Sequence, residues 1–168
     1  MWVLTRLNTV LSKLSYSLAM LIVAIMVMAL SLSAITRYIS GTGYDWLIEL
    51  PPILVCWLVF PLLGPLLKEG NHIQVDFISS VVPSGVILYI KVAMNMTAFL
   101  ASLVFFKAGY DATMLYYRLG QMMELELDIP IWWMYLSFPV GFIILALFSI
   151  ELTIKSFLEA REPNKEKS

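Results

Sequence analysis

The sequence predicts an all-α integral membrane protein with four transmembrane helices. Hydrophobic residues make up 60% of the 168 residues, whereas soluble globular domains contain about 45 to 50%. Charged residues make up 14% and leave four long uncharged runs between them. A soluble chain of this length cannot bury so much apolar surface, and the scarcity of charge argues against disorder and against a nucleic-acid partner. We predict spans over about residues 16–35, 47–67, 86–106 and 130–150 in a single domain, 1–168.

The first uncharged run lies between Lys13 and Arg37. It is long enough to cross the roughly 30 Å hydrocarbon core of a bilayer at about 1.5 Å per residue. A secretory signal peptide is the alternative, because Arg6 and Lys13 resemble its basic region. The apolar stretch is longer than the roughly 7 to 15 residues of a signal core, so we favour a membrane span over 16–35.

The second run, Leu50 to Leu67, is rich in proline. Proline lacks a backbone donor and bends or breaks a helix. In a membrane the freed carbonyls must be satisfied by neighbouring helices or by water. The sequence therefore predicts a bend that makes the second span, over 47–67, irregular.

The third span, over 86–106, contains Lys91 near one end, where its side chain can reach the lipid headgroups. Helical character is expected to continue to Gly120, because glycine commonly ends helices. One face of this span carries polar and small residues that could receive a neighbouring helix of this chain or of a partner. These residues are Lys91, Asn95, Ala98 and Ser102.

Apolar and acidic residues alternate from Met123 to Ile129, just before the fourth span. A period of two predicts an extended segment with one apolar and one acidic face. We interpret Asp128 as the N-terminal cap of the fourth helix, with Pro130 in its first turn. Residues 159–168 are expected to form a cytoplasmic tail.

The basic residues predict the orientation of the chain. Four spans place both termini on one side, and eight of the 11 Lys and Arg residues fall on that side. The other three are Arg37, Lys107 and Arg118. Because basic residues concentrate on the cytoplasmic side of membrane proteins, both termini are predicted to be cytoplasmic.

The inner connection between spans two and three is predicted to contain a short interfacial helix. Asn71 and Gln74 form a weaker version of a capping box at its start. His72 and Asp76, four residues apart, lie on one face and can pair. The helix is expected to end near Pro83.

The sequence lacks the residues that membrane enzymes and redox carriers need. A single histidine excludes bis-histidine haem ligation by this chain, and the single cysteine, Cys56, excludes a disulfide generator and a zinc site. We therefore expect no enzyme activity, no cofactor and no metal. Glu49 and Lys91 are the only charged residues within the predicted spans, which argues against ion-coupled transport by this chain alone.

The chain resembles the small membrane subunit of tripartite ATP-independent periplasmic (TRAP) transporters over roughly residues 15–155. The pieces that carry the resemblance are, in chain order, Arg37-Tyr38, Trp46 to Glu49, the run Glu69-Gly70-Asn71-His72-Ile73-Gln74-Val75-Asp76, Pro83, Ile129-Pro130 and Pro139-Val140-Gly141. The resemblance implies a bacterial inner-membrane protein that pairs with a large membrane subunit carrying the substrate and sodium sites. It also implies a periplasmic binding protein that delivers a substrate, typically an organic acid. The small subunit is implied to flank and extend the static scaffold among membrane lipids.

The candidate interface residues lie at the span ends, on one face of the third span and in the connections. They are Arg37, Asp45, Trp46, Glu49, His72, Asp76, Lys91, Asn95, Glu124, Glu126 and Asp128. We predict that Arg37 pairs with Glu49 or with the large subunit, and that the acidic residues of the outer edge help to receive the periplasmic protein. The alternative is a self-contained, oligomeric four-span transporter or exporter. A membrane anchor for a redox enzyme is a third possibility.

Overall fold

The structure, a computed structural model, describes residues 2–70, 84–124 and 128–161, and this part of the chain is helical apart from its connections. Its elements are α1 (Trp2–Ser40), α2 (Trp46–Val59), the 3₁₀-helix η1 (Phe60–Leu62), the helical residues 63–70, α4 (Ser84–Leu119), α5 (Ile131–Tyr135) and α6 (Ser137–Arg161). Four stretches are long and apolar enough to cross a membrane, namely Leu4–Ser40, Trp46–Gly70, Tyr89–Leu119 and Ile131–Leu158. The prediction of four spans is confirmed. The predicted interfacial helix lies outside the described residues.

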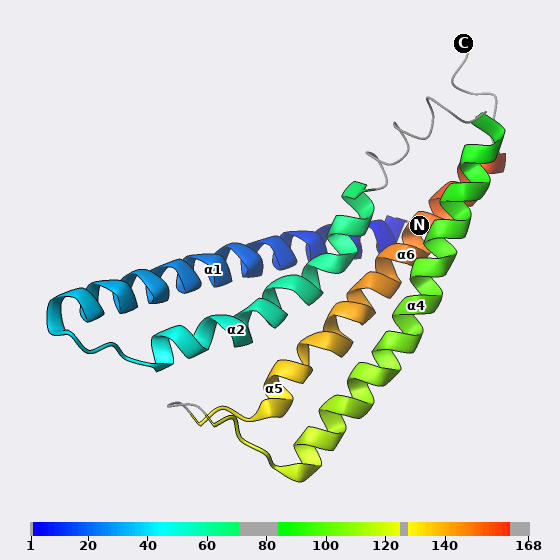
Figure 1. Ribbon diagram of the computed structural model, residues 1–168. Coiled ribbons are helices and arrows are strands. Elements are labelled where there is room, and N and C mark those ends of the chain that lie inside the picture. Colours follow the sequence, from blue (N-terminus) through cyan, green and yellow to red (C-terminus); the bar gives the residue numbers. More distant parts are fainter. Residues whose placement is uncertain (1, 71–83, 125–127, 162–168) are drawn as a thin grey trace.

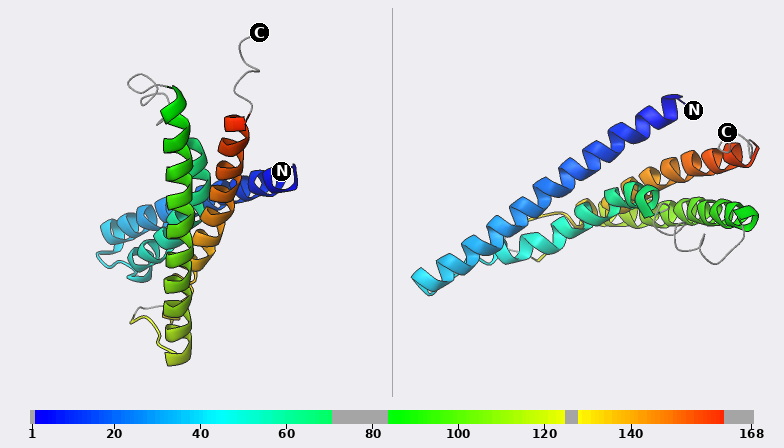
Figure 2. Two further views of the ribbon diagram at one scale, coloured as in Figure 1. Left: turned by 90° about the vertical axis from the view of Figure 1, so that its right-hand side faces the viewer. Right: turned by 90° about the horizontal axis from the view of Figure 1, so that it is seen from above.

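The helices form two pairs that diverge from a common end (Figure 1). α1 packs along α2, and α4 packs along α6. The pairs meet where η1 and α1 contact α6, and the α1 contact lies near the end that carries the N-terminus. Seen from above, α6 lies between α1 and α4 (Figure 2). α6 is therefore the central helix, and its residues Phe148, Ser149 and Glu151 are fully buried.

α1 and α4 are longer than a bilayer is thick. They contain 39 and 36 residues, which correspond to about 58 and 54 Å of helix against roughly 30 Å of hydrocarbon. The spans predicted from the uncharged runs cover only part of α1 and part of α4. Residues 2–40 contain no glycine or proline, so nothing in the sequence stops α1 at the membrane boundary. α4 ends where predicted, because Gly120 follows it with a φ of 60° that favours glycine.

The second span is interrupted, as its prolines predict. α2 contains Pro51 and Pro52, and the 3₁₀-helix η1 follows before the chain becomes helical again over residues 63–70. α6 approaches this interruption closely at Gly141. A Cβ atom at Gly141 would lie 2.5 Å from the Phe60 carbonyl oxygen, so only glycine fits there.

The prediction that Asp128 caps the fourth span is wrong. α5 begins at Ile131, with Pro130 at the N-cap in an extended conformation. The backbone of Met123 donates to Ile129 at 2.9 Å, and Ile131 donates to Gln121 at 3.1 Å. This pairing holds the chain extended through Pro130, so the helix cannot begin earlier. It also agrees with the predicted extended segment at both of its ends, whereas residues 125–127 lie outside the described part.

The polar face of α4 packs against α6 of the same chain. Asn95 is 2% exposed and Ser102 is fully buried. The Asn95 Nδ2 atom donates to Ser156 Oγ on α6 at 3.5 Å. At these two residues, the face receives a helix of its own chain.

Candidate functional site

A buried carboxylate lies at the end of the bundle where α1 begins and α6 ends. Glu151, on α6, is 1% exposed, and Asn8, on α1, is completely buried. The Asn8 Nδ2 atom donates to Glu151 Oε2 at 2.6 Å and lies 3.2 Å from the Leu147 carbonyl oxygen, which it also contacts as a donor. A single amide side chain thus connects α1 to two consecutive turns of α6.

Two lysines neutralise this carboxylate. Lys155 Nζ lies 3.2 Å from Glu151 Oε1, and Lys68 Nζ lies 3.7 Å from the same oxygen. Lys68 comes from the helical residues 63–70, and its ammonium group also lies 5.8 Å from the centre of the Phe148 ring. We call Asn8, Lys68, Glu151 and Lys155 the carboxylate cluster. It joins the first, second and fourth spans.

The carboxylate cluster is suited to fixing helix positions. Removing one partner of a buried ion pair leaves an uncompensated charge, which destabilises a protein strongly. Both lysines and Asn8 must therefore stay close to Glu151, and this requirement sets which turns of the three spans meet. A neighbouring contact acts in the same way, because the Tyr16 hydroxyl on α1 donates to Glu69 Oε1 at 2.7 Å.

The opposite part of the bundle is held by aromatic rings. The Trp57 indole donates to the Trp133 carbonyl oxygen at 3.1 Å, and the two indole rings lie 6.1 Å apart. Phe60 and Phe138 have ring centres 4.0 Å apart. We call this set the aromatic layer, which also includes the stacked pair Tyr116–Tyr135 and the edge-to-face pair Tyr117–Trp132. It joins α2 and η1 to α5 and α6, and α4 to α5.

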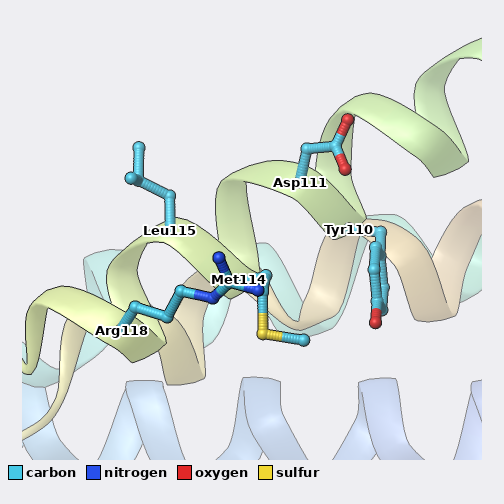
Figure 3. A pocket seen from close by; sticks show the side chains of 5 residues that line it. All are labelled: Tyr110, Asp111, Met114, Leu115 and Arg118. Atoms are coloured by element: carbon cyan, nitrogen blue, oxygen red, sulfur yellow. The ribbon is translucent and has the colours of Figure 1, made fainter.

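A hollow of about 310 Å³ lies on the later half of α4. Its lining residues are Tyr110, Asp111, Met114, Leu115 and Arg118, all from this one helix. Figure 3 shows Asp111 pointing away from Tyr110 and Met114. Because no second element lines it, the hollow is an open depression and has no converging polar groups.

The family model described as "Tripartite ATP-independent periplasmic transporters, DctQ component" matches residues 26–159. The chain belongs to this family. No curated protein matches the chain. The match spans the later part of α1, from residue 26, and all of the described residues from α2 to residue 159, so the chain is the small membrane component of a TRAP transporter. DctQ is a transporter component and not an enzyme family.

Three members of the carboxylate cluster, Lys68, Glu151 and Lys155, fall within the region that matches the DctQ component. Asn8 precedes it. The amide that connects α1 to α6 is thus contributed by a segment outside the matched region.

Four of the predicted interface residues lie around the turn between α1 and α2. Arg37 is exposed in the last turn of α1, and its side chain lies beside Gly43, where an added Cβ would be 3.2 Å from Arg37 Nε. Asp45 is exposed at the N-cap of α2 without a side-chain capping bond. Trp46 and Glu49 are half-buried in the first turn of α2. The pairing of Arg37 with Glu49 stays a prediction.

The other predicted residues are spread over the DctQ chain. Lys91 is half-buried on α4, one turn from Asn95. Glu124 and Asp128 are exposed at the two ends of the extended loop. His72, Asp76 and Glu126 lie outside the described residues. Within residues 2–70, 84–124 and 128–161, no group of three His, Cys, Asp or Glu side chains is placed to hold a metal ion.

Sequence reasoning missed the carboxylate cluster. The fourth span was predicted to stop at Ile150 because Glu151 is the first charge after the uncharged run, yet α6 continues to Arg161. One local signal was available. Glu151 and Lys155 are four residues apart, and no glycine or proline follows Gly141 before the predicted tail, so the helix should extend with the two charges paired on one face.

Proposed function

We propose that this chain is the scaffold-extending small permease subunit of a TRAP-type secondary transporter. It would pair with a large membrane subunit in sodium-coupled, binding-protein-dependent uptake of organic acids. The observation that carries the proposal is the DctQ match over residues 26–159. The proposed location is the bacterial inner membrane, with both termini cytoplasmic, based on the distribution of basic residues.

The arrangement of charges supports a static role. Glu151, the buried carboxylate of the described residues, is engaged by Asn8 and two lysines. Proton and ion pathways need ionisable groups that change partners, whereas this carboxylate ties three spans together. A rigid connection of this kind suits a subunit that braces a moving partner.

Unburied apolar surface supports a membrane partner. The most apolar window of the third span, within Tyr89–Leu119, is only 11% buried, and that of the first span, within Leu4–Ser40, is 22% buried. These faces are available to lipid and to the large subunit. Arg37 and Glu49 at one end, and His72 and Asp76 in the inner connection, are proposed as further positions of that interface.

We also propose that the acidic outer edge helps to receive the periplasmic substrate-binding protein. Asp45, Glu124 and Asp128 are exposed, so their carboxylates are free to steer a basic partner surface. Electrostatic docking of this kind weakens as salt rises, because the Debye length falls to about 8 Å at 0.15 M salt.

Reconstitution into liposomes tests the proposed function. We expect uptake of an organic acid only when the chain is combined with a large TRAP membrane subunit, the binding protein and an inward sodium gradient. The same liposomes without the gradient are the control. Uptake by the chain alone would contradict the proposal and favour a self-contained four-span transporter.

A further inference from the structure

A groove runs along the N-terminal part of α1. Its first section, of about 290 Å³, is lined by Thr9, Ser12, Lys13 and Tyr16 of α1 and by Lys68 and Glu69 of the facing helical residues. A second hollow of about 360 Å³ continues toward the N-terminus and shares Thr9 and Lys13 with the first. Arg6 lines this second section. We call the two sections the N-terminal groove.

The N-terminal groove carries more positive than negative charge. Its cations are Arg6 and Lys13, together with Lys68, which also pairs with Glu151, and its carboxylate is Glu69. The Tyr16 hydroxyl donates to Glu69 Oε1 at 2.7 Å, which satisfies part of that carboxylate. Arg6 and Lys13 are exposed. The ammonium group of Lys13, which lines both sections, and the guanidinium group of Arg6 in the second section suit a phosphate group, which accepts several charge-assisted hydrogen bonds.

The polarity of α1 changes directly beyond the groove. Thr9, Lys13 and Tyr16 continue, at helical spacings of three and four residues, into Met20, Val23 and Val27 on the same face. These three apolar side chains are 67%, 45% and 59% exposed. The groove also lies at the boundary of the uncharged run that begins after Lys13, where a spanning helix reaches the headgroup level. A polar end followed by an exposed apolar strip matches the order of groups in a phospholipid.

We propose that the N-terminal groove binds the phosphate headgroup of an acidic membrane phospholipid, whose acyl chains lie along Met20, Val23 and Val27. Basic pockets between transmembrane helices are suited to acidic headgroups. A dissolved phosphate ion would gain nothing from the apolar strip, so a lipid fits the groove better than a free ion. The lipid would contact both α1 and the helical residues 63–70. This site is independent of the proposed transport function.

Native mass spectrometry of the full-length chain in detergent tests the site. The probes are dioleoyl phosphatidylglycerol and dioleoyl phosphatidylcholine, which share acyl chains and differ in net charge. We expect retained phosphatidylglycerol to exceed phosphatidylcholine. Arg6→Gln and Lys13→Gln should each lower this preference about fivefold, since one basic residue near the headgroups contributes about a fivefold attraction.

The control is Lys107→Gln, which removes an exposed cation from α4 and should leave the preference unchanged. Glu69→Gln should raise the preference, because it removes the carboxylate from the groove. Lys13→Arg should retain it, which separates loss of charge from loss of fold.

Three results would overturn the proposal. One is equal retention of the two lipids by the unaltered chain. Another is a loss in Lys107→Gln as large as that in Lys13→Gln. The third is displacement of the lipid by millimolar inorganic phosphate, which would assign the groove to a dissolved anion.

Discussion

The two ends of this bundle are held by different chemistry. At the end that carries the N-terminus, the carboxylate cluster joins three spans through a few polar atoms, with Asn8 donating to Glu151 at 2.6 Å. The aromatic layer is held by ring pairs. The ring centres of Phe60 and Phe138 lie 4.0 Å apart, and those of Tyr116 and Tyr135 lie 4.5 Å apart. Polar contacts lose most of their energy when a partner is removed, whereas ring contacts are each small and can readjust.

This difference follows from the membrane environment. Lipid tails are as apolar as the side chains they surround, so burial of apolar area does not drive helices together as it does in water. A buried ion pair and a directional hydrogen bond then specify which turns meet. The aromatic rings add contact area, and Trp57 also donates a hydrogen bond to Trp133. A single substitution should therefore lower the free energy of unfolding by different amounts at the two ends.

The largest effect is expected for Glu151→Ala. It leaves the buried Asn8 amide without its charged acceptor, and losing a hydrogen bond to a charged group costs about 1.5 to 3 kcal/mol. Lys68 and Lys155 lose the same partner, but their side chains are 29% and 37% exposed and still reach water, so they add little to this cost. Thermal unfolding of the detergent-solubilised chain should show a large fall in midpoint. The midpoint of Glu151→Gln should lie between those of Glu151→Ala and the unaltered chain, because the carbonyl oxygen of glutamine can still accept from Asn8.

Glu124→Ala is the matched control, since Glu124 is exposed and outside the cluster. Equal midpoints for Glu151→Ala and Glu124→Ala would refute the assignment of the cluster as the main connection between the spans.

A smaller loss is expected for Tyr116→Leu in the aromatic layer. The substitution keeps an apolar side chain and removes the stacking on Tyr135, which is a contact of about 0.5 to 1.5 kcal/mol. The same unfolding assay measures it. Tyr38→Leu serves as the control, because Tyr38 is 92% exposed. If Tyr116→Leu destabilised the chain more than Glu151→Ala, the contrast between the two ends would be reversed.

The smallest effect is expected for Tyr16→Phe. It removes the hydroxyl that donates to Glu69, a bond at the exposed surface whose contribution should be at most about 1 kcal/mol. The comparison is Tyr44→Phe, at a tyrosine that is 57% exposed. A midpoint for Tyr16→Phe as low as that of Glu151→Ala would mean that the Tyr16–Glu69 contact belongs to the central connection.

The sequence predicts local features of this fold well. Uncharged runs mark all four spans, the prolines predict the interruption at η1, and Gly120 ends α4. The carboxylate cluster could not be predicted in the same way, because Asn8 and Glu151 are 143 residues apart. No periodic pattern links them, since their contact depends on how α1 crosses α6.

The prediction of a helix cap at Asp128 failed for a similar reason. Aspartate is a good cap by residue type, but the pairing of Met123 with Ile129 keeps the chain extended beyond it. A backbone contact across the loop therefore overrides the local preference, and a sequence pattern read residue by residue does not contain that contact.

The interruption of the second span has a consequence for biosynthesis. Pro61 and Pro65 have no N–H groups, so the carbonyls four residues earlier, at Trp57 and Pro61, lack their usual helical donors. α6 covers this region through Gly141, yet it is made some eighty residues later. A nascent chain that has inserted three helices therefore leaves Phe60 without the close cover of Gly141, and we expect it to stay near the insertion machinery until the fourth helix arrives. The order of synthesis thus makes the last helix the step that completes the fold.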